Sequence, residues 1–232
     1  MAAKAAIAAK AAISWSAGKD SCLALLRARE SGFGVATFLT MQEADGSSKS
    51  HALPPALVAA QVAALGGAWI AAPVGGAPGD YGRVFAAQLL ALRASGHSHL
   101  VFGDIDLQAH RDWLVPMCEQ AGLVALFPLW GEPRAALAQE IVRRGIRARL
   151  VCVDPLRLDA AFCGAEYDAA LLARLPAGVC PCGEDGEFHT FVWDAPGFAA
   201  PLRWRSLGQR TVLAPPPMRP TPLVFDTLAL LT

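Results

Sequence analysis

The chain has 232 residues, enough for one large domain or two small ones, and because 54% of them are hydrophobic and only 17% charged it can bury a substantial core. Twenty Lys and Arg balance 20 Asp and Glu, which gives no net charge and a pI of about 6.9. Because it has no basic block or arm, the sequence disfavours nucleic acid as a partner.

The first twelve residues are rich in alanine and superficially resemble a secretory signal. Lys10 interrupts the apolar run that such a signal needs, so we interpret them as a tail entering the first strand and expect a cytoplasmic protein. Residues 52–79 carry no charge, but proline and glycine break them into short pieces. A membrane span needs about 20 continuous apolar residues, so we expect no membrane association.

An apolar run at residues 11–15 is followed by a loop of mostly small residues, Ser16-Ala17-Gly18-Lys19-Asp20-Ser21, and by an amphipathic helix that ends at Gly32. Such a loop binds phosphate well, because backbone N–H groups can approach the anion and the helix N-terminus adds positive charge. Lys19 adds a full charge, and Asp20 suits Mg²⁺. The loop is not a Walker A loop, because Lys19 is followed by an acidic residue. An ordinary strand-to-helix turn is the alternative.

Strand and helix patterns then alternate as far as residue 127. Further strands are predicted at residues 35–40, 68–71, 99–102 and 123–127, and helices at 55–65, 81–92 and 114–121. Pro116 is expected to kink or restart the last helix. The alternation implies a parallel sheet covered on both faces, with ligands at the carboxyl ends of its strands. Gly103 and Asp104 follow a strand, so they and the first loop can line one crevice.

The second part of the chain has a looser pattern. Pro133 opens a helix, residues 150–153 form a strand, Asp168 starts a short helix, and residues 188–193 form another strand. Beyond them the pattern fades towards a proline-rich run at 215–222. We therefore expect an α/β fold with a parallel-sheet domain at residues 1–130 and a smaller α+β domain at 131–232.

An acidic turn leads into the last predicted strand, with the sequence Cys182-Gly183-Glu184-Asp185-Gly186-Glu187-Phe188-His189-Thr190. A solvated acidic turn is one interpretation. The other is that the glycines let the turn approach a ligand closely, with carboxylates aimed at an amine or a metal. Strict alternation would put Phe188 and Thr190 on the face opposite His189, so that only one set faces a site.

The six cysteines are mostly isolated, and none forms a C-x-x-C pair. We expect reduced thiols. Cys180 and Cys182 form the one close pair, but this spacing is a poor frame for tetrahedral zinc, so we expect no metal there.

The first loop resembles the S-G-G-K-D-S loop of the PP-loop, or N-type, ATP pyrophosphatases, with Ala17 in place of the first glycine. Alanine is costly there only if the position needs a positive φ; we predict a φ that suits alanine, so Ala17→Gly would change activity little. Further segments resemble the diphthine–ammonia ligase family in order and spacing: Gly103-Asp104-Ile105, Arg111, Pro128-Leu129-Trp130 and the G-E-x-G-E-(F/Y)-x-T block at 183–190.

The resemblance implies a HUP-type, Rossmann-like ATP-binding domain followed by a substrate-binding domain. It implies adenylation of a carboxylate by ATP and attack by ammonia, which would yield an amide, AMP and pyrophosphate. The phosphate-binding residues would be Ser16, Ala17, Gly18, Lys19 and Ser21. Lys19 would stabilise charge on the leaving pyrophosphate, and Asp20 would hold Mg²⁺. Gly103 and Asp104 would close the nucleotide crevice, and Glu184 and Glu187 would face the substrate.

Other functions remain open. A non-catalytic ATP or AMP sensor of the HUP class fits Ala17 but leaves the acidic turn unexplained, whereas a tRNA sulfurtransferase is disfavoured by the neutral charge and the cysteine spacing. The carboxylate is either a small molecule or a protein side chain, and a homodimer remains open. His51 and His189 are further site candidates, His189 as a proton carrier.

Overall fold

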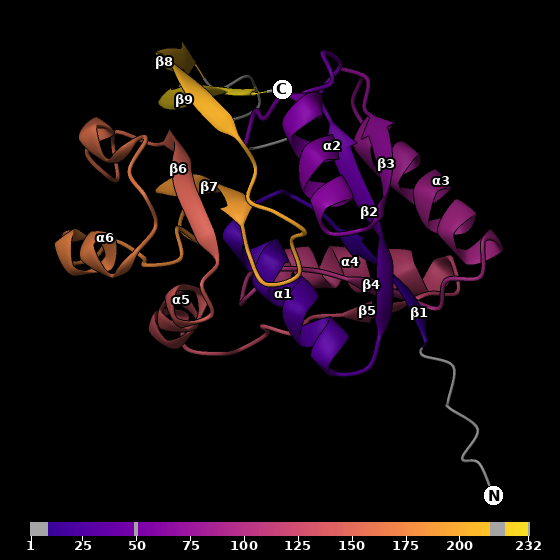
Figure 1. Cartoon of the computed structure of the whole chain (residues 1–232). Coiled ribbons are helices and arrows are strands. Elements are labelled where there is room, and N and C mark those ends of the chain that lie inside the picture. The colour runs from indigo at the N-terminus through magenta and orange to yellow at the C-terminus, as the bar shows by residue number, and fades with distance from the viewer. Residues whose placement is uncertain (1–8, 49–50, 214–220, 232) are drawn as a thin grey trace, which may run out of the picture.

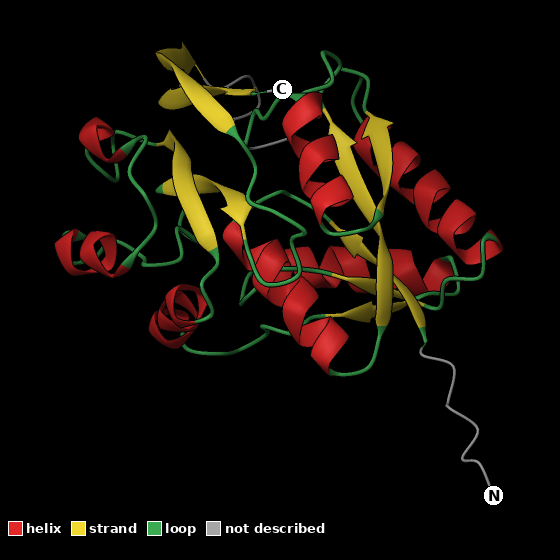
Figure 2. Cartoon of the chain, viewed as in Figure 1, coloured by secondary structure: helices red, strands yellow, loops and turns green. Residues whose placement is uncertain are grey.

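The computed structural model describes residues 9–48, 51–213 and 221–231, and its first half is built on a parallel sheet (Figures 1 and 2). The five strands are β1 (Lys10–Ser14), β2 (Gly34–Gln42), β3 (Ala68–Pro73), β4 (His99–Val101) and β5 (Val124–Leu126). Their order across the sheet is β3-β2-β1-β4-β5, and each neighbouring pair is parallel. The order reverses between β1 and β4, which places a ligand crevice at their carboxyl ends.

Four helices connect these strands: α1 (Lys19–Glu30), α2 (Pro55–Ala64), α3 (Asp80–Ala94) and α4 (Gln108–Gln120). Their buried side chains fall into two hydrophobic clusters, one containing α1 and α2 and the other α3 and α4. The sheet is therefore covered on both faces, as the alternating pattern predicts. Of the two outcomes expected at Pro116, a kink or a restart, the helix does not restart: α4 is one helix with this proline inside it.

The second half forms an antiparallel sheet with short helices beside it (Figure 1). Its elements are α5 (Arg134–Arg143), β6 (Arg147–Val153), a 3₁₀ turn (Ala160–Phe162), α6 (Ala169–Arg174), β7 (Phe188–Asp194), β8 (Trp204–Leu213) and β9 (Pro222–Leu230). The strand order is β7-β6-β9-β8. The structure thus has an α/β part followed by a smaller α+β part.

Sequence patterning missed β8 and β9. No residue of β8 is buried, so this strand shows no alternation between a buried and an exposed face. Pro222, assigned above to a proline-rich run, is the first residue of β9, a position where a strand tolerates proline. Residues 215–220 of that run lie outside the described residues.

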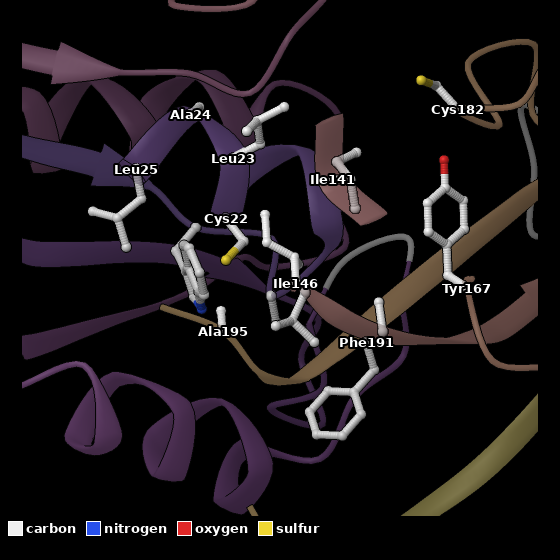
Figure 3. Close-up of a cluster of buried hydrophobic side chains, with 14 of the residues drawn as sticks. Cys22, Leu23, Ala24, Leu25, Ile141, Ile146, Tyr167, Cys182, Phe191 and Ala195 are labelled. Atoms are coloured by element: carbon white, nitrogen blue, oxygen red, sulfur yellow. The ribbon is translucent and has the colours of Figure 1, made fainter. Parts of the chain in front are cut away.

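The hydrophobic core on the α1 side continues into the antiparallel sheet. Figure 3 shows Cys22 and Leu25 of α1 in one cluster with Ile141 of α5, with Ile146 just before β6, and with Phe191 of β7. These five side chains are fully or almost fully buried. The two halves therefore share one core. No helix among the described residues is long and apolar enough to span a membrane.

Gln61 of α2 joins the two sheets through buried hydrogen bonds. Its side-chain carbonyl accepts from Trp15 Nε1 at 3.1 Å, and its amide donates to the backbone oxygens of Ala17 and Val192. Trp15 and Ala17 follow β1, whereas Val192 lies on β7. Because Gln61 is fully buried, water cannot replace these bonds.

We expect Gln61→Leu to keep the side-chain volume but to leave buried polar groups without partners. Each such group costs about 1–3 kcal/mol, so the free energy of unfolding should fall by about 3 kcal/mol in urea denaturation. Gln139→Leu, at an exposed position of α5, is the matched control and should stay within about 0.5 kcal/mol of the parent. Equal stability of the two variants would contradict this role.

Candidate active-site cleft

A cavity of about 280 Å³ lies where the two halves meet, at the carboxyl ends of β1 and β4. The first loop and the acidic turn both line it, although more than 160 residues separate them in the sequence. Its lining residues are Ser14, Ser16, Lys19, Asp20, Ser21, His51, Gly103, Asp104, Leu107, His110, Cys182, Gly183, Glu184, Gly186, Phe188, His189 and Thr190. Of the predicted site residues, Ala17, Gly18 and Glu187 are not part of this lining.

Loop 16–21 is held by its own serine hydroxyls and ends at the start of α1. Ser16 Oγ accepts from the Gly18 N–H at 3.3 Å and lies 3.1 Å from Ser21 Oγ, which donates to the Gly18 carbonyl at 3.0 Å. Gly18 is the N-cap residue of α1. A Cβ there would lie 2.7 Å from His51 Cε1, so no other residue fits without displacing that ring. Lys19, Asp20 and Ser21 of the first turn of α1 line the cleft, so the N-terminus of this helix opens into it and suits an anion.

Ala17 adopts a left-handed backbone, with φ of +69°. Our expectation of a φ that suits alanine is therefore wrong, and the Cβ costs about 1–2 kcal/mol here. The conformation is imposed from outside the loop, because the Ala17 carbonyl accepts the Val192 N–H at 3.0 Å as well as the Gln61 amide. Ala17 is fully buried, so it supports the loop from the core and does not face the cleft.

Lys19 is a buried cation between the two motifs. Its Nζ lies 2.8 Å from Asp20 Oδ2 and donates to the Cys182 carbonyl at 2.5 Å, with the rings of Tyr167 and Phe188 within 5.5 Å. Burial lowers the pKa of Lys19, but the neighbouring acidic groups, with Asp20 foremost, outweigh it and raise the pKa overall. Lys19 is therefore charged and already positioned before any ligand arrives.

One carboxylate oxygen of Asp20 has no hydrogen-bond partner among the described residues. Its Oδ2 pairs with Lys19, whereas its Oδ1 is buried and has no hydrogen-bond partner among the described residues. A bare buried carboxylate oxygen is costly unless a cation or a donor joins it. Among the described residues no group of three or more His, Cys, Asp or Glu could form a metal site. The arrangement thus fits Mg²⁺, which is usually held by one or two carboxylates together with substrate phosphates.

The two glutamates of the acidic turn have different positions. Glu184 lines the cleft, and burial, followed by the charge of Asp20, raises its pKa to about 7 against the opposing charge of Lys19. Glu187 does not face the substrate as expected. It is buried and accepts the N–H groups of Cys180 at 2.8 Å and Asp185 at 3.0 Å, so it braces the turn from inside.

Gly103 and Asp104 lie beside the first loop. A Cβ on Gly103 would lie 2.8 Å from the Ser21 nitrogen, so glycine allows this segment to pack against the start of α1. Asp104 lines the cleft, and its Oδ1 lies 2.9 Å from Nδ1 of His110. His110 also lines the cleft and was not among the residues chosen from the sequence. Its place six residues after Asp104, at the start of the next helix, was the available signal.

His51 and His189 both lie in the cleft, with ring centroids 4.8 Å apart. His51 Nδ1 is 2.7 Å from the Thr190 carbonyl oxygen. Burial lowers the pKa of His51 to about 4 and, with the charges of His51 and Lys19, that of His189 to about 3. Both rings are therefore neutral at pH 7, and this lowered pKa disfavours His189 as a proton carrier near neutral pH.

Strict alternation along β7 does not hold at its start. Phe188, His189 and Thr190 all line the cleft, because β7 begins at Phe188 and its pairing with β6 shifts register between Leu150 and Cys152. Thr190 also fixes the first loop, since its Oγ1 accepts the Lys19 N–H at 3.1 Å. The acidic turn is tied down separately by Arg134, a residue missed from the sequence, which pairs with Asp106 and Asp185.

Two family models match the sequence. The diphthamide synthase N-terminal domain matches residues 9–125, and the diphthamide synthase C-terminal domain matches residues 133–209. Among curated proteins there is no significant match. A solved structure described as a predicted subunit of tRNA methyltransferase from Methanocaldococcus jannaschii DSM aligns at 15% identity over 81% of this chain and 98% of that chain, with a TM-score of 0.44. A likeness of that size carries no argument about function.

His51 and His189, the two partly buried histidines of the cleft, make the stability of the fold depend on pH. The pKa of each ring is lower in the folded chain than in the unfolded chain. Above pH 6.5 both rings are neutral in either state, so the free energy of unfolding is unaffected there. As the pH falls from 6.5 towards about 4, the unfolded chain binds protons first, and the free energy of unfolding falls. The loss approaches about 1.4 kcal/mol per pH unit for each histidine. We expect His189→Asn to flatten the slope of unfolding free energy between pH 6.5 and 5, measured by urea denaturation. An unchanged slope would show that His189 takes up its proton over the same pH range in the folded and the unfolded chain, which would contradict the lowered pKa.

Proposed function

The chain belongs to the diphthamide synthase family, a family of PP-loop ATP pyrophosphatases, and from this premise we propose that it is an ATP-dependent ligase. On this proposal it adenylates a carboxylate and converts it to an amide with ammonia, releasing AMP and pyrophosphate. The observation that carries the proposal is the meeting of loop 16–21 and the acidic turn in one cleft, with Lys19 in contact with both. A protein that only sensed a nucleotide would have no use for the second motif.

The first half of the reaction concerns ATP. The N-terminus of α1 and the residues Ser16 and Ser21 line the cleft and suit the phosphates, and Asp20 Oδ1 would hold Mg²⁺, which when bound neutralises phosphate charge. The substrate carboxylate attacks the α-phosphorus, and the bond to the β-phosphate breaks. Lys19 stabilises the negative charge that develops on the leaving pyrophosphate, and its fixed position means that no reorganisation is needed.

The second half concerns ammonia. Its nitrogen attacks the carbonyl carbon of the adenylated carboxylate, the bond from that carbon to the AMP oxygen breaks, and one proton must leave the nitrogen. Glu184 lines the cleft and has a pKa of about 7, which suits a group that accepts a proton near neutral pH. Holding the reactants side by side in this cleft contributes further to the rate.

We expect the purified protein to form AMP and pyrophosphate from ATP and Mg²⁺ when ammonium and a pool of carboxylic acids are supplied, with the amide identified by mass spectrometry. Lys19→Ala and Asp20→Asn should each lower the rate of pyrophosphate release by about 100-fold or more, because each removes charge stabilisation at the phosphates. Asp112→Asn, on the exposed side of α4, is the matched control and should keep the parental rate.

Circular dichroism of each variant shows whether the fold is intact. Full turnover in both loop variants would remove the loop from the reaction. Tight ATP binding without AMP formation, with every carboxylate and with ammonium present, would favour the sensor instead.

A further inference from the structure

A second cavity, of about 370 Å³, lies wholly in the second half of the chain and is here called the α5–α6 pocket. It is lined by the end of α5, the start of β6, the segment that leads into α6 and the end of β7 (Figure 1). It shares no lining residue with the cleft. Val142, Ile146 and Ala148 give it apolar walls, and its volume lies in the range of small-molecule sites.

Arg147 is the cation of this pocket, and no carboxylate among the described residues forms an ion pair with it. Its guanidinium lies over the Trp193 ring, 3.8 Å from the ring centroid. Arg149, two residues along β6, instead pairs with Asp226 at 2.7 Å and with Glu166 at 3.7 Å. A guanidinium carries five N–H donors in its plane, so stacking on a ring leaves its edge open to an anion. Arg147 is therefore held in place without a partner of opposite charge.

Two carboxylates line the same pocket, those of Glu166 and Asp168. Glu166 is already engaged, because it accepts Trp193 Nε1 at 3.1 Å and pairs with Arg149. Asp168 has no cationic partner among the described residues; its Oδ1 accepts the Leu171 N–H at 2.7 Å as the N-cap of α6. The pocket thus contains one cation and one anion that are each left without a counter-charge.

An amino acid in its zwitterionic form carries the complementary pair of charges. Its carboxylate is planar and can accept two parallel N–H bonds from a guanidinium, and its ammonium group can donate to a carboxylate oxygen. A phosphate or a plain carboxylic acid would pair with Arg147 but would repel Asp168. An apolar side chain suits the walls of the pocket, because burying a further charge without a partner is costly.

We propose that the α5–α6 pocket binds an apolar α-amino acid, with its carboxylate on Arg147 and its ammonium group on Asp168. Tyr167 separates this pocket from the cleft. It lines the pocket, its hydroxyl donates to the Pro181 carbonyl at 2.7 Å, and its ring centroid lies 5.5 Å from Lys19 Nζ in the cleft. The site is thus additional to the ATP reaction proposed above, and it takes its ligand without a nucleotide.

The test is isothermal titration calorimetry of the full chain, without ATP, with leucine, valine, methionine and phenylalanine as probes. Two further probes keep the carbon skeleton of leucine but lack one charge: isocaproate has no ammonium group, and isoamylamine has no carboxylate. Loss of a hydrogen bond to a charged group corresponds to about a 10- to 100-fold rise in Kd. We expect at least one of the four amino acids to bind, and both single-charge probes to bind that much more weakly than leucine.

Two variants locate the site. Arg147→Met removes the charge but keeps an apolar stem on the Trp193 ring, and Asp168→Asn removes the charge but keeps a residue that caps a helix well. Each should raise the Kd of the amino acid by about 10-fold or more. Arg174→Met is the matched control, because Arg174 is stacked in the same way on Phe162 but does not line the pocket, and it should keep the parental Kd.

Three results would overturn the inference: no binding of any of the four amino acids by the parent protein, equal binding of leucine and isocaproate, or parental affinity in Arg147→Met or Asp168→Asn. The first two comparisons need no variant, so they decide the matter even if a variant does not fold. None of these results bears on the release of pyrophosphate from ATP, so the proposed function stands or falls separately.

Discussion

The cleft depends on a set of hydrogen bonds between loop 16–21 and strand β7. Lys19 N–H donates to Thr190 Oγ1, Val192 N–H donates to the Ala17 carbonyl, and Gln61 joins both segments. Through these bonds an antiparallel strand from the second half closes over loop 16–21 of the first half. A parallel sheet alone would provide the loop and the start of α1, but only β7 brings the acidic turn to them. The strain at Ala17 follows from the same bonds, because its carbonyl must point towards Val192.

Much of the fold could be predicted from the sequence because burial leaves a pattern. Strands covered on both faces form continuous apolar runs, and helices covered on one face show a stripe, so the parallel sheet and its helices were expected in the right order. β8 left no such pattern, because no residue along it is buried. Residues that follow parallel strands gather at one edge of the sheet, because all the strands run in the same direction. The first loop and Asp104 both follow such strands, so the sequence alone predicted that they line one crevice.

The finer parts of the site depend on contacts that a linear pattern does not contain. The orientation of Glu187 is set by the N–H groups of Cys180 and Asp185, which the folded turn brings around it. The positive φ of Ala17 is set by Val192, far along the chain. His110 reaches the cleft, and Arg134 reaches the acidic turn, from helices whose positions follow from packing. In each case the residue type was visible, but its partner came from a distant part of the chain.

The shared core has a consequence for how such a chain could evolve. The family models leave a short gap between residues 125 and 133, as if two modules had been joined. Yet Cys22 and Leu25 of α1 pack in one core with Ile141 and Phe191 of the second half. On the same helix, Arg27 donates to the Pro128 carbonyl and forms ion pairs with Glu132 and Glu140. The parallel-sheet half on its own would expose that face of α1 to water. The halves are therefore not interchangeable parts, and a new second half could replace this one only if it buried the same helix.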